Sequence, residues 1–296
     1  MKFFLKLSDD SQGILFGIIA CFFASVLIAI VKYLSDDFHI FFIVMMRNFF
    51  GLLFFLPGIL KDHKKVLHTK KLNLHLYRSI GGLVSTVVWF HVITIIPMSE
   101  AVSISFIIPI ITIIVAVIFL KEKVHSHIWI ASFIGFIGIV IILRPGFREF
   151  NPAYFYCFIS MVLWVNSNIL IKLMTRTERP QTIVAYMSFI MLFVSMPFAF
   201  PYLEPVNVKS LCWFILLGIV SNLLHIFVSN AYAKTDLSKV QPFDFTRLLF
   251  TAIISYFVFG EVIDIWVIIG SLVIFVGVLI AIPRKSKKQI LVTVDP

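Results

Sequence analysis

Residues 239–259, KVQPFDFTRLLFTAIISYFVF, form an apolar stretch that carries an acid and an arginine three positions apart, Asp244 and Arg247. A helix needs about 20 residues to cross the hydrocarbon core of a bilayer, so this stretch is long enough to do so. Nine further stretches have a similar length and character. They are residues 13–34, 38–60, 76–96, 99–120, 127–143, 152–173, 183–203, 210–232 and 263–282. We therefore expect an all-α membrane protein with ten transmembrane helices.

The composition supports this class. Of the 296 residues 60% are hydrophobic and only 14% are charged, and the mean hydropathy is +1.03. A soluble protein of this size could not bury that much apolar surface. A net charge of +10 would suggest nucleic acid as the partner of a soluble protein, so the positions of the positive charges matter.

Lysine and arginine fall unevenly on the two sides of the predicted bundle. Of the 25, 19 lie on the side of the N-terminus and four on the other side, and Arg47 and Arg247 lie within apolar stretches. Because basic loops stay in the cytoplasm, we expect both termini there and a multi-pass protein in the cell (inner) membrane. The charge then follows from topology, and we expect no nucleic-acid partner.

An internal repeat becomes visible when the sequence is shifted by about 140 residues. Phe-Leu-Lys-Glu at 119–122 then meets Val-Phe-Gly-Glu at 258–261, and Gly138 meets Gly277. We predict two five-helix repeats, at 13–144 and 152–283, and a short basic cytoplasmic tail at 284–296. Because five is odd, the second repeat starts on the opposite side of the membrane. Inverted repeats of this kind are typical of alternating-access transporters.

Three segments resemble a known family. They are FHVITIIPMSEAVSISFIIPIITIIVAVIFLKEK at 90–123, MVLWVNSNILIK at 161–172 and QPFDFTRLLFTAIISYFVFGEVIDIWVIIG at 241–270. The sequence is similar to EamA-type members of the drug/metabolite transporter superfamily over residues 13–283. The resemblance implies ten spans in two repeats and a transporter of small molecules, with S-adenosylmethionine, riboflavin, amino acids and drugs among the cargoes of such proteins. Lys121 departs from the glycine that the family often has before the glutamate.

Three charged residues are expected inside the bundle. Arg47 and Arg247 lie about nine residues into their stretches, which places them about 13 Å deep in a core of about 30 Å. An unpaired arginine there costs about 2.5–3.5 kcal/mol, so each must face the interior. Asp244 lies on the same helix face as Arg247, and the pair is either a brace or part of a site. Arg47 has no acid on its own helix, so it either braces two helices or contacts a carboxylate or phosphate of the cargo.

Polar and aromatic residues form further stripes at helical spacing. Trp164 and Asn168 are four residues apart, Asn222 and His225 are three apart, and Trp89 follows Ser85 by four. Each stripe is expected to face the interior, where it either lines the path or joins helices by hydrogen bonds. We expect Trp89 and Trp164 to stack on a planar or cationic substrate. If protons drive transport, Asp244 is the first candidate carrier and His225 the second.

Other classes are less compatible with the sequence. An intramembrane enzyme would need a catalytic motif, and a GxSxG elbow, paired metal-binding histidines and a GxxxxGK[ST] loop are all missing. We therefore expect no catalytic residue, metal or cofactor. A secondary transporter of a metabolite such as S-adenosylmethionine is favoured, and an amino-acid or drug exporter and a channel remain alternatives. The expected partners are a small-molecule substrate and the lipid bilayer, and a homodimer is allowed.

Overall fold

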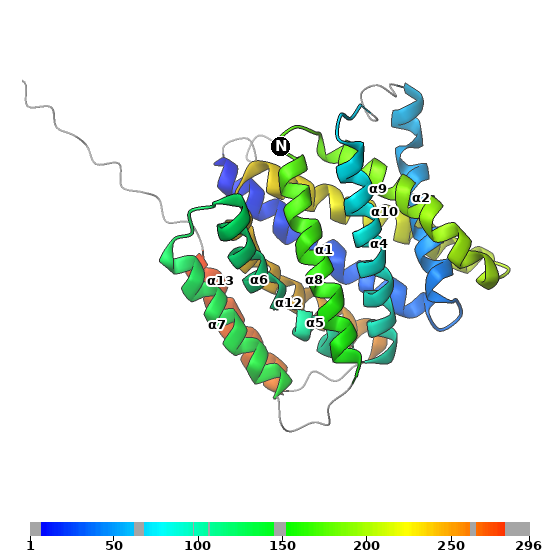
Figure 1. Ribbon diagram of the computed structural model, residues 1–296. Coiled ribbons are helices and arrows are strands. Elements are labelled where there is room, and N and C mark those ends of the chain that lie inside the picture. The colour runs from blue at the N-terminus through cyan, green and yellow to red at the C-terminus, as the bar shows by residue number, and fades with distance from the viewer. Residues whose placement is uncertain are drawn as a thin grey trace, which may run out of the picture.

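The computed structural model describes residues 7–61, 68–96, 98–105, 107–144, 152–260 and 265–281, and every regular element within these ranges is a helix (Figure 1). Lys2, Lys6, Glu261 and the predicted tail 284–296 lie outside the described residues. The helices form one bundle. In Figure 1, α7 and α13 make one flank of it and α2 and α9 the other, with α4 and α8 between them.

Helices cover the apolar stretches of both halves. The first half contains α1 (Asp9–Leu34), α2 (Ile40–Lys61), α4 (Leu72–Ile95), α5 (Met98–Ser105), α6 (Ile107–Val115), the π-helix η2 (Ala116–Leu120) and α7 (Ser126–Leu143). The second half contains α8 (Ala153–Met174), α9 (Pro180–Ala199), the 3-10 helix η3 (Phe200–Tyr202), α10 (Val208–Lys234), α11 (Leu237–Val240), the 3-10 helix η4 (Gln241–Phe245), α12 (Thr246–Phe259) and α13 (Ile265–Ala281). Seven helical runs of the described residues are long and apolar enough to cross a membrane, and three apolar helices are shorter.

The helix contacts have a twofold pattern. A shift of about 140 residues turns α1 into α8 and α4 into α10. The contact of α1 with α10 thereby becomes the contact of α8 with α4, and both pairs pack along each other. The contact of α5 with α12 likewise becomes the contact of η4 with α6, and the pairs α2 with α9 and α7 with α13 each join a helix to its own counterpart. Equivalent helices of the two halves therefore make equivalent contacts across the bundle.

Two equivalent spans are each interrupted, the second-half span near its start and the first-half span near its end. In the second half α11 and α12 are separated by the 3-10 helix η4, which begins Gln241-Pro242; proline has no N–H to donate to a regular helix. In the first half α6 runs into the π-helix η2. Both spans end in a left-handed residue, Lys121 with φ 55° and Gly260 with φ 64°. The glycine that the family often has before the glutamate therefore has a backbone reason, and Lys121 occupies the same conformation with a side chain.

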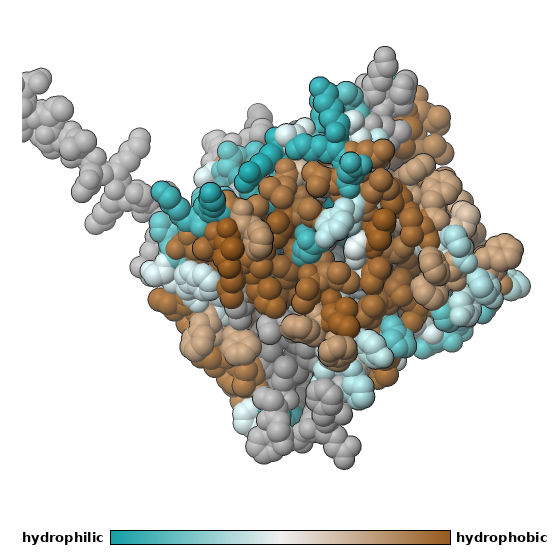
Figure 2. All heavy atoms as spheres, viewed as in Figure 1, coloured by the Kyte–Doolittle hydropathy of each residue, from teal (hydrophilic) through white to brown (hydrophobic). Residues whose placement is uncertain are grey.

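The α7 and α13 pair is packed through glycine. A Cβ atom added to Gly138 would lie 2.7 Å from the carbonyl oxygen of Gly270, and one added to Gly277 would lie 2.9 Å from that of Ala131. Small residues let helices in a membrane approach to backbone contact. On the face shown in Figure 2, apolar residues form a broad band, and hydrophilic residues gather along its upper edge, the edge at which α1 begins in Figure 1.

The start of α4 changes the charge count made from the sequence, which places Arg78 on the side of the N-terminus. The helix begins at Leu72, and Arg78 is a helical residue that is 2% exposed and not a loop charge. His75 is 1% exposed, and its Nε2 lies 2.5 Å from Glu178 Oε2. The first turns of α4 therefore already pack inside the bundle.

Candidate functional site

A cavity of the bundle, which we call the first cavity, encloses about 600 Å³ of space between atoms, including space open to solvent. Residues of α1, α2, α4 and α5 from the first half line it together with residues of α8, α10 and α12 from the second. Its wall includes five of the residues singled out from the sequence, Arg47, Trp89, Trp164, His225 and Arg247.

A second cavity of about 550 Å³ adjoins the first. Trp164 and Arg247 line both, so they stand at the boundary between the two. Asp244 and Asn168 line only the second cavity. Seven of the eight candidate residues therefore face connected internal space. The first cavity carries the positive charge of Arg47, while the acid lies in the second.

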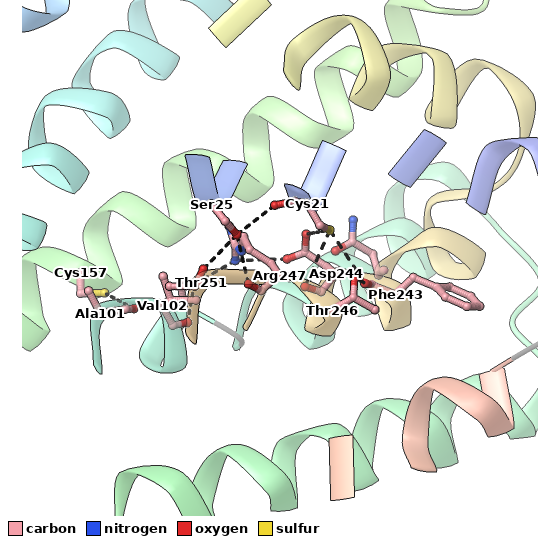
Figure 3. A network of polar contacts seen from close by, with 12 residues as sticks. Cys21, Ser25, Ala101, Val102, Cys157, Phe243, Asp244, Thr246, Arg247 and Thr251 are labelled. Atoms are coloured by element: carbon pink, nitrogen blue, oxygen red, sulfur yellow. Dashed lines mark hydrogen bonds and ion pairs between the residues drawn. The ribbon is translucent and has the colours of Figure 1, made fainter. Parts of the chain in front are cut away.

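Asp244 and Arg247 form the expected ion pair, with Asp244 Oδ2 and Arg247 Nη2 3.2 Å apart (Figure 3). Arg247 Nη2 also donates to Ser105 Oγ at 2.9 Å, which joins α12 to α5 of the other half. Asp244 Oδ1 accepts a hydrogen bond from Cys21 Sγ at 3.5 Å. The pair thus connects three helices from both halves at the break in the second span. It braces the bundle and lines the cavities at the same time.

A second set of polar contacts secures α1 against α12. Ser25 Oγ lies 3.1 Å from the carbonyl oxygen of Arg247 and 3.0 Å from Thr251 Oγ1 (Figure 3). Both side chains are fully buried, and a buried hydroxyl needs a partner. These bonds hold the first turn of α12 in place and with it the backbone that carries Arg247.

Arg47 has only neutral partners among the described residues. Its Nη2 donates to Asn48 Oδ1 at 3.2 Å and to Met191 Sδ at 3.4 Å, and its guanidinium lies 5.9 Å from the ring centre of Phe90. Its Nε has no acceptor. Asp244 is not among its partners, because Asp244 is paired with Arg247. Arg47 is 3% exposed and faces the first cavity.

The remaining candidates divide by role. His225 is buried on α10, with its ring 5.9 Å from that of Trp164. Asn222 lines neither cavity; its Nδ2 donates to the carbonyl oxygen of Gly51 at 2.6 Å, and its Oδ1 accepts from Ser188 at 3.1 Å. It therefore joins α10 to α2 and α9. Its helical spacing from His225 indicated the interior correctly but could not separate a cavity wall from a helix contact.

One end of the bundle is held closed by polar contacts, and we call it the clamped end. Lys172 Nζ donates to the carbonyl oxygens of Tyr232 at 2.8 Å and Thr235 at 2.6 Å, at the end of α10. The carboxylate of Glu122 accepts from the backbone N–H groups of Leu237 and Ser238, both at 3.1 Å. Lys172 and Glu122 thus hold the two sides of the turn between α10 and α11.

The same end is fastened to α1. Lys239 pairs with Asp10 at 2.9 Å and Lys234 with Asp9 at 2.8 Å, and Thr235 Oγ1 also donates to Asp10. All of these groups lie where α1 starts and α10 ends. The sequence interpretation of Glu122 as a structural residue at a helix end agrees with its contacts.

The sequence pointed to Ser85 but not to the buried Arg78 or to three further hydroxyls that line the first cavity. Ser85 Oγ donates to the carbonyl oxygen of Ser160 at 2.9 Å, and both serines line the cavity beside Thr86 and Ser105. Arg78 could have been found, because it stands four residues before Gly82 and seven before Ser85 on one helix face. Single serines, in contrast, carry no signal that separates a cavity wall from a helix contact.

Comparisons with known proteins agree with this arrangement. Residues 11–144 and 151–282 each match the model of the EamA-like transporter family, which confirms the resemblance seen in the sequence. The chain is 28% identical over 256 residues to the S-adenosylmethionine uptake transporter of Rickettsia felis, with 86% of this chain and 87% of that protein covered. It is 28% identical over 219 residues to the riboflavin transporter of Brucella anthropi, with 71% and 77% covered.

The fold also has a counterpart among solved structures. One crystal structure matches 91% of this chain and 98% of its own chain with a TM-score of 0.76 at 16% sequence identity. At that identity the match concerns the fold alone. Three features of this bundle bear on its activity. Its cavities are lined by residues of both halves, one end is held by polar contacts, and the five-helix unit is repeated.

Proposed function

Because the chain belongs to the EamA-like transporter family, whose model matches both of its halves, we propose that it moves a small metabolite across the cytoplasmic membrane as a secondary transporter. It is a multi-pass membrane protein with a small-molecule substrate and not an enzyme, as the family and the transporters similar to it indicate. The mechanism we propose is alternating access between two inverted repeats.

The architecture we propose has ten spans, five in each repeat, with both termini in the cytoplasm. The repeats are 13–144 and 152–283, and 284–296 is a basic tail. The twofold pattern of helix contacts and the distribution of lysine and arginine, which is 18 to 4 once Arg78 is counted inside the bundle, support this. The clamped end then faces the cytoplasm, and it is closed in this structure. Exchange of conformations between inverted repeats would close the other end and open this one.

The observation that carries the proposal is the first cavity. Both halves line it, and two arginines and two tryptophans converge on it: Arg47, Arg247, Trp89 and Trp164. A movement of one half against the other therefore changes the wall on every side of a bound molecule. We propose that these residues, with Asn168, Asp244 and His225, contact or couple to the substrate. The contacts of Asn222 favour a bracing role.

For the substrate we propose a metabolite of the size of S-adenosylmethionine. The named transporters similar to this chain carry S-adenosylmethionine or riboflavin, and both molecules contain a planar heterocycle. Such a ring can stack on Trp89 or Trp164. Export of an amino acid or drug is the alternative within the family.

Uptake into proteoliposomes tests the proposal. Purified protein is reconstituted and supplied with labelled S-adenosylmethionine, riboflavin and amino acids, with empty liposomes as the control. We expect saturable uptake of one of them and acceleration by unlabelled substrate inside. Uptake that stays linear with concentration and shows no such acceleration would indicate a channel and contradict the proposal. Equal rates with and without an imposed pH gradient would exclude Asp244 and His225 as proton carriers.

A further inference from the structure

The centre of the bundle holds two arginines whose charge no acid balances. Arg47 on α2 is 3% exposed and Arg78 on α4 is 2% exposed, and neither belongs to an ion pair among the described residues. Arg47 Nε and both Nε and Nη1 of Arg78 have no hydrogen-bond acceptor. A buried cation without a partner is strongly destabilising. Stability of the fold alone does not explain two such arginines in one region of the bundle.

The two arginines act on one another and on a third group. Arg47 and His225 line the first cavity. Arg78 is not among the lining residues; it lies on α4 seven residues before Ser85, which is, and it is near enough to Arg47 and His225 for electrostatic interaction with both. His225 Nδ1 also has no hydrogen-bond partner. Three helices thus bring unpaired ring or guanidinium nitrogens to one region, and like charges gathered there repel each other.

Two described acids near these helices are already engaged. Asp244 is held by Arg247 at 3.2 Å. Glu178, which follows α8, is bound by His75 Nε2 at 2.5 Å and by Thr69 Oγ1. Among the side chains that the structure describes, no carboxylate pairs with Arg47 or Arg78.

We propose that Arg47 and Arg78 bind an anionic group of the transported molecule, a carboxylate or a phosphate. This rests on the proposed transport function and specifies the class of its substrate. A guanidinium presents paired N–H groups that match the two oxygens of either group. Arg47 lines the first cavity together with Trp89, Phe90 and Trp164. The site therefore fits a planar ring linked to an acidic group.

This assignment separates the cargoes suggested by the comparisons. S-adenosylmethionine carries a carboxylate on its amino-acid part, whereas riboflavin carries no anionic group. The electrostatics of the site favour a molecule of the first kind. They also favour riboflavin 5′-phosphate over riboflavin, because the two differ only in the phosphate.

Matched ligands test the inference. Competition for uptake or binding is measured with S-adenosylmethionine against its decarboxylated form, and with riboflavin 5′-phosphate against riboflavin. The first pair reports on a carboxylate and the second on a phosphate. We expect the acidic member of at least one pair to compete about 10- to 100-fold better, as a charged hydrogen-bonded contact implies. Equal competition within both pairs would overturn the inference and leave the transport function standing.

Variants connect the preference to these residues. Arg47→Met and Arg78→Met are expected to reduce it to about threefold or less, whereas Arg47→Lys retains part of it because the charge stays and the paired geometry is lost. Arg176→Met is the matched control, since Arg176 is exposed in the turn after α8. A preference that persists in both methionine variants would refute the assignment.

A second measurement does not depend on the cargo. In a variant that retains Trp164 and has the other four tryptophans replaced by phenylalanine, quenching by iodide is compared with quenching by neutral acrylamide. We expect iodide to quench more strongly than acrylamide, and Arg47→Met with Arg78→Met to abolish the excess. An arginine-dependent excess in a protein that transports none of the labelled compounds would support the anion site and contradict the transport proposal. No excess would overturn the anion site alone.

Discussion

Replacement of Lys172 by methionine tests whether the clamped end works as a gate. The Lys172 ammonium donates to two carbonyl oxygens at the end of α10, those of Tyr232 at 2.8 Å and Thr235 at 2.6 Å. Methionine keeps an unbranched apolar side chain of similar length but donates no hydrogen bond. Both carbonyl oxygens then lose this donor in the closed state, while in an open state water can reach them.

The size of the effect follows from these two bonds. A hydrogen bond to a charged group contributes about 1.5–3 kcal/mol. The lower value applies here, because Lys172 is only partly buried and water can replace part of each bond. Two bonds then contribute about 3 kcal/mol, and since about 1.4 kcal/mol corresponds to a factor of ten, the open state should become about 100-fold more populated.

Cys21 provides the readout. It is buried and lines the second cavity, which lies inward of the clamped end. With Cys157 and Cys212 replaced by alanine, a membrane-impermeant thiol reagent is applied to inside-out vesicles and the rate of Cys21 labelling is measured. When brief opening precedes labelling, the rate follows the open population. We expect Lys172→Met to raise it by up to about 100-fold, and Lys172→Arg to raise it less.

The control for this experiment is Arg176→Met, which removes a positive charge from the exposed turn that follows the same helix. It should leave the labelling rate within about twofold of the parent protein, because a surface charge contributes little. The reasoning is refuted if Lys172→Met labels at the rate of this control. It is also refuted if labelling accelerates only from the opposite side of the membrane.

Three further changes follow from backbone and helix contacts. Gly260→Ala should destabilise the protein by about 1–2 kcal/mol from its left-handed backbone alone, since no atom lies within 4 Å of the added Cβ. Lys121→Gly should raise the melting temperature in detergent for the same backbone reason. If Lys121→Ala raised it as well, the gain would come from removal of the lysine charge instead. Gly138→Ala should lower the melting temperature, because its Cβ would lie 2.7 Å from the Gly270 carbonyl oxygen, whereas Gly81→Ala, which has open space around it, should not. Asn222→Ala should lower the free energy of unfolding by about 1–3 kcal/mol, because two buried hydrogen bonds are lost, and should leave the KM for substrate unchanged. A large rise in KM would assign Asn222 to the substrate site instead.

Apolar stretches and local spacing were enough to predict where most helices lie and that Arg47, Asp244 and Arg247 face inward. Asp244 and Arg247 are three residues apart, so any helical turn brings them to one face, and the 3-10 turn that precedes Arg247 does the same. Arg47 had to face the interior because lipid cannot solvate it. These inferences depend only on local spacing and on the bilayer, and the structure shows both arginines at the first cavity.

What the sequence could not predict depends on contacts between distant helices. Arg78 lies in a turn that follows a lysine-rich loop, and its burial results from the packing of α4 against α8 and α9. Glu178 and His75 are 103 residues apart, and no local pattern connects them. Likewise, Lys172 and Glu122 both hold the turn between α10 and α11, although they belong to different halves. Residues of this kind become visible only when the fold brings their elements together.

The repeat suggests that Lys32 has the role of Lys172 at the opposite end. With one residue of slippage the two lysines are equivalent, and both lie in the last turn of their helices, α1 and α8. In this structure Lys32 Nζ lies 5.2 Å from the ring centre of Phe259, the last residue of α12.

If the halves exchange conformations, Lys32 should hold the end of α4 when the clamped end opens. Lys32→Met should then disfavour that open state and slow the labelling of Cys21 from the cytoplasmic side, whereas Lys172→Met accelerates it. Opposite signs from two equivalent lysines are expected only of a bundle that alternates between two closures. Equal signs would mean that both residues merely stabilise the fold.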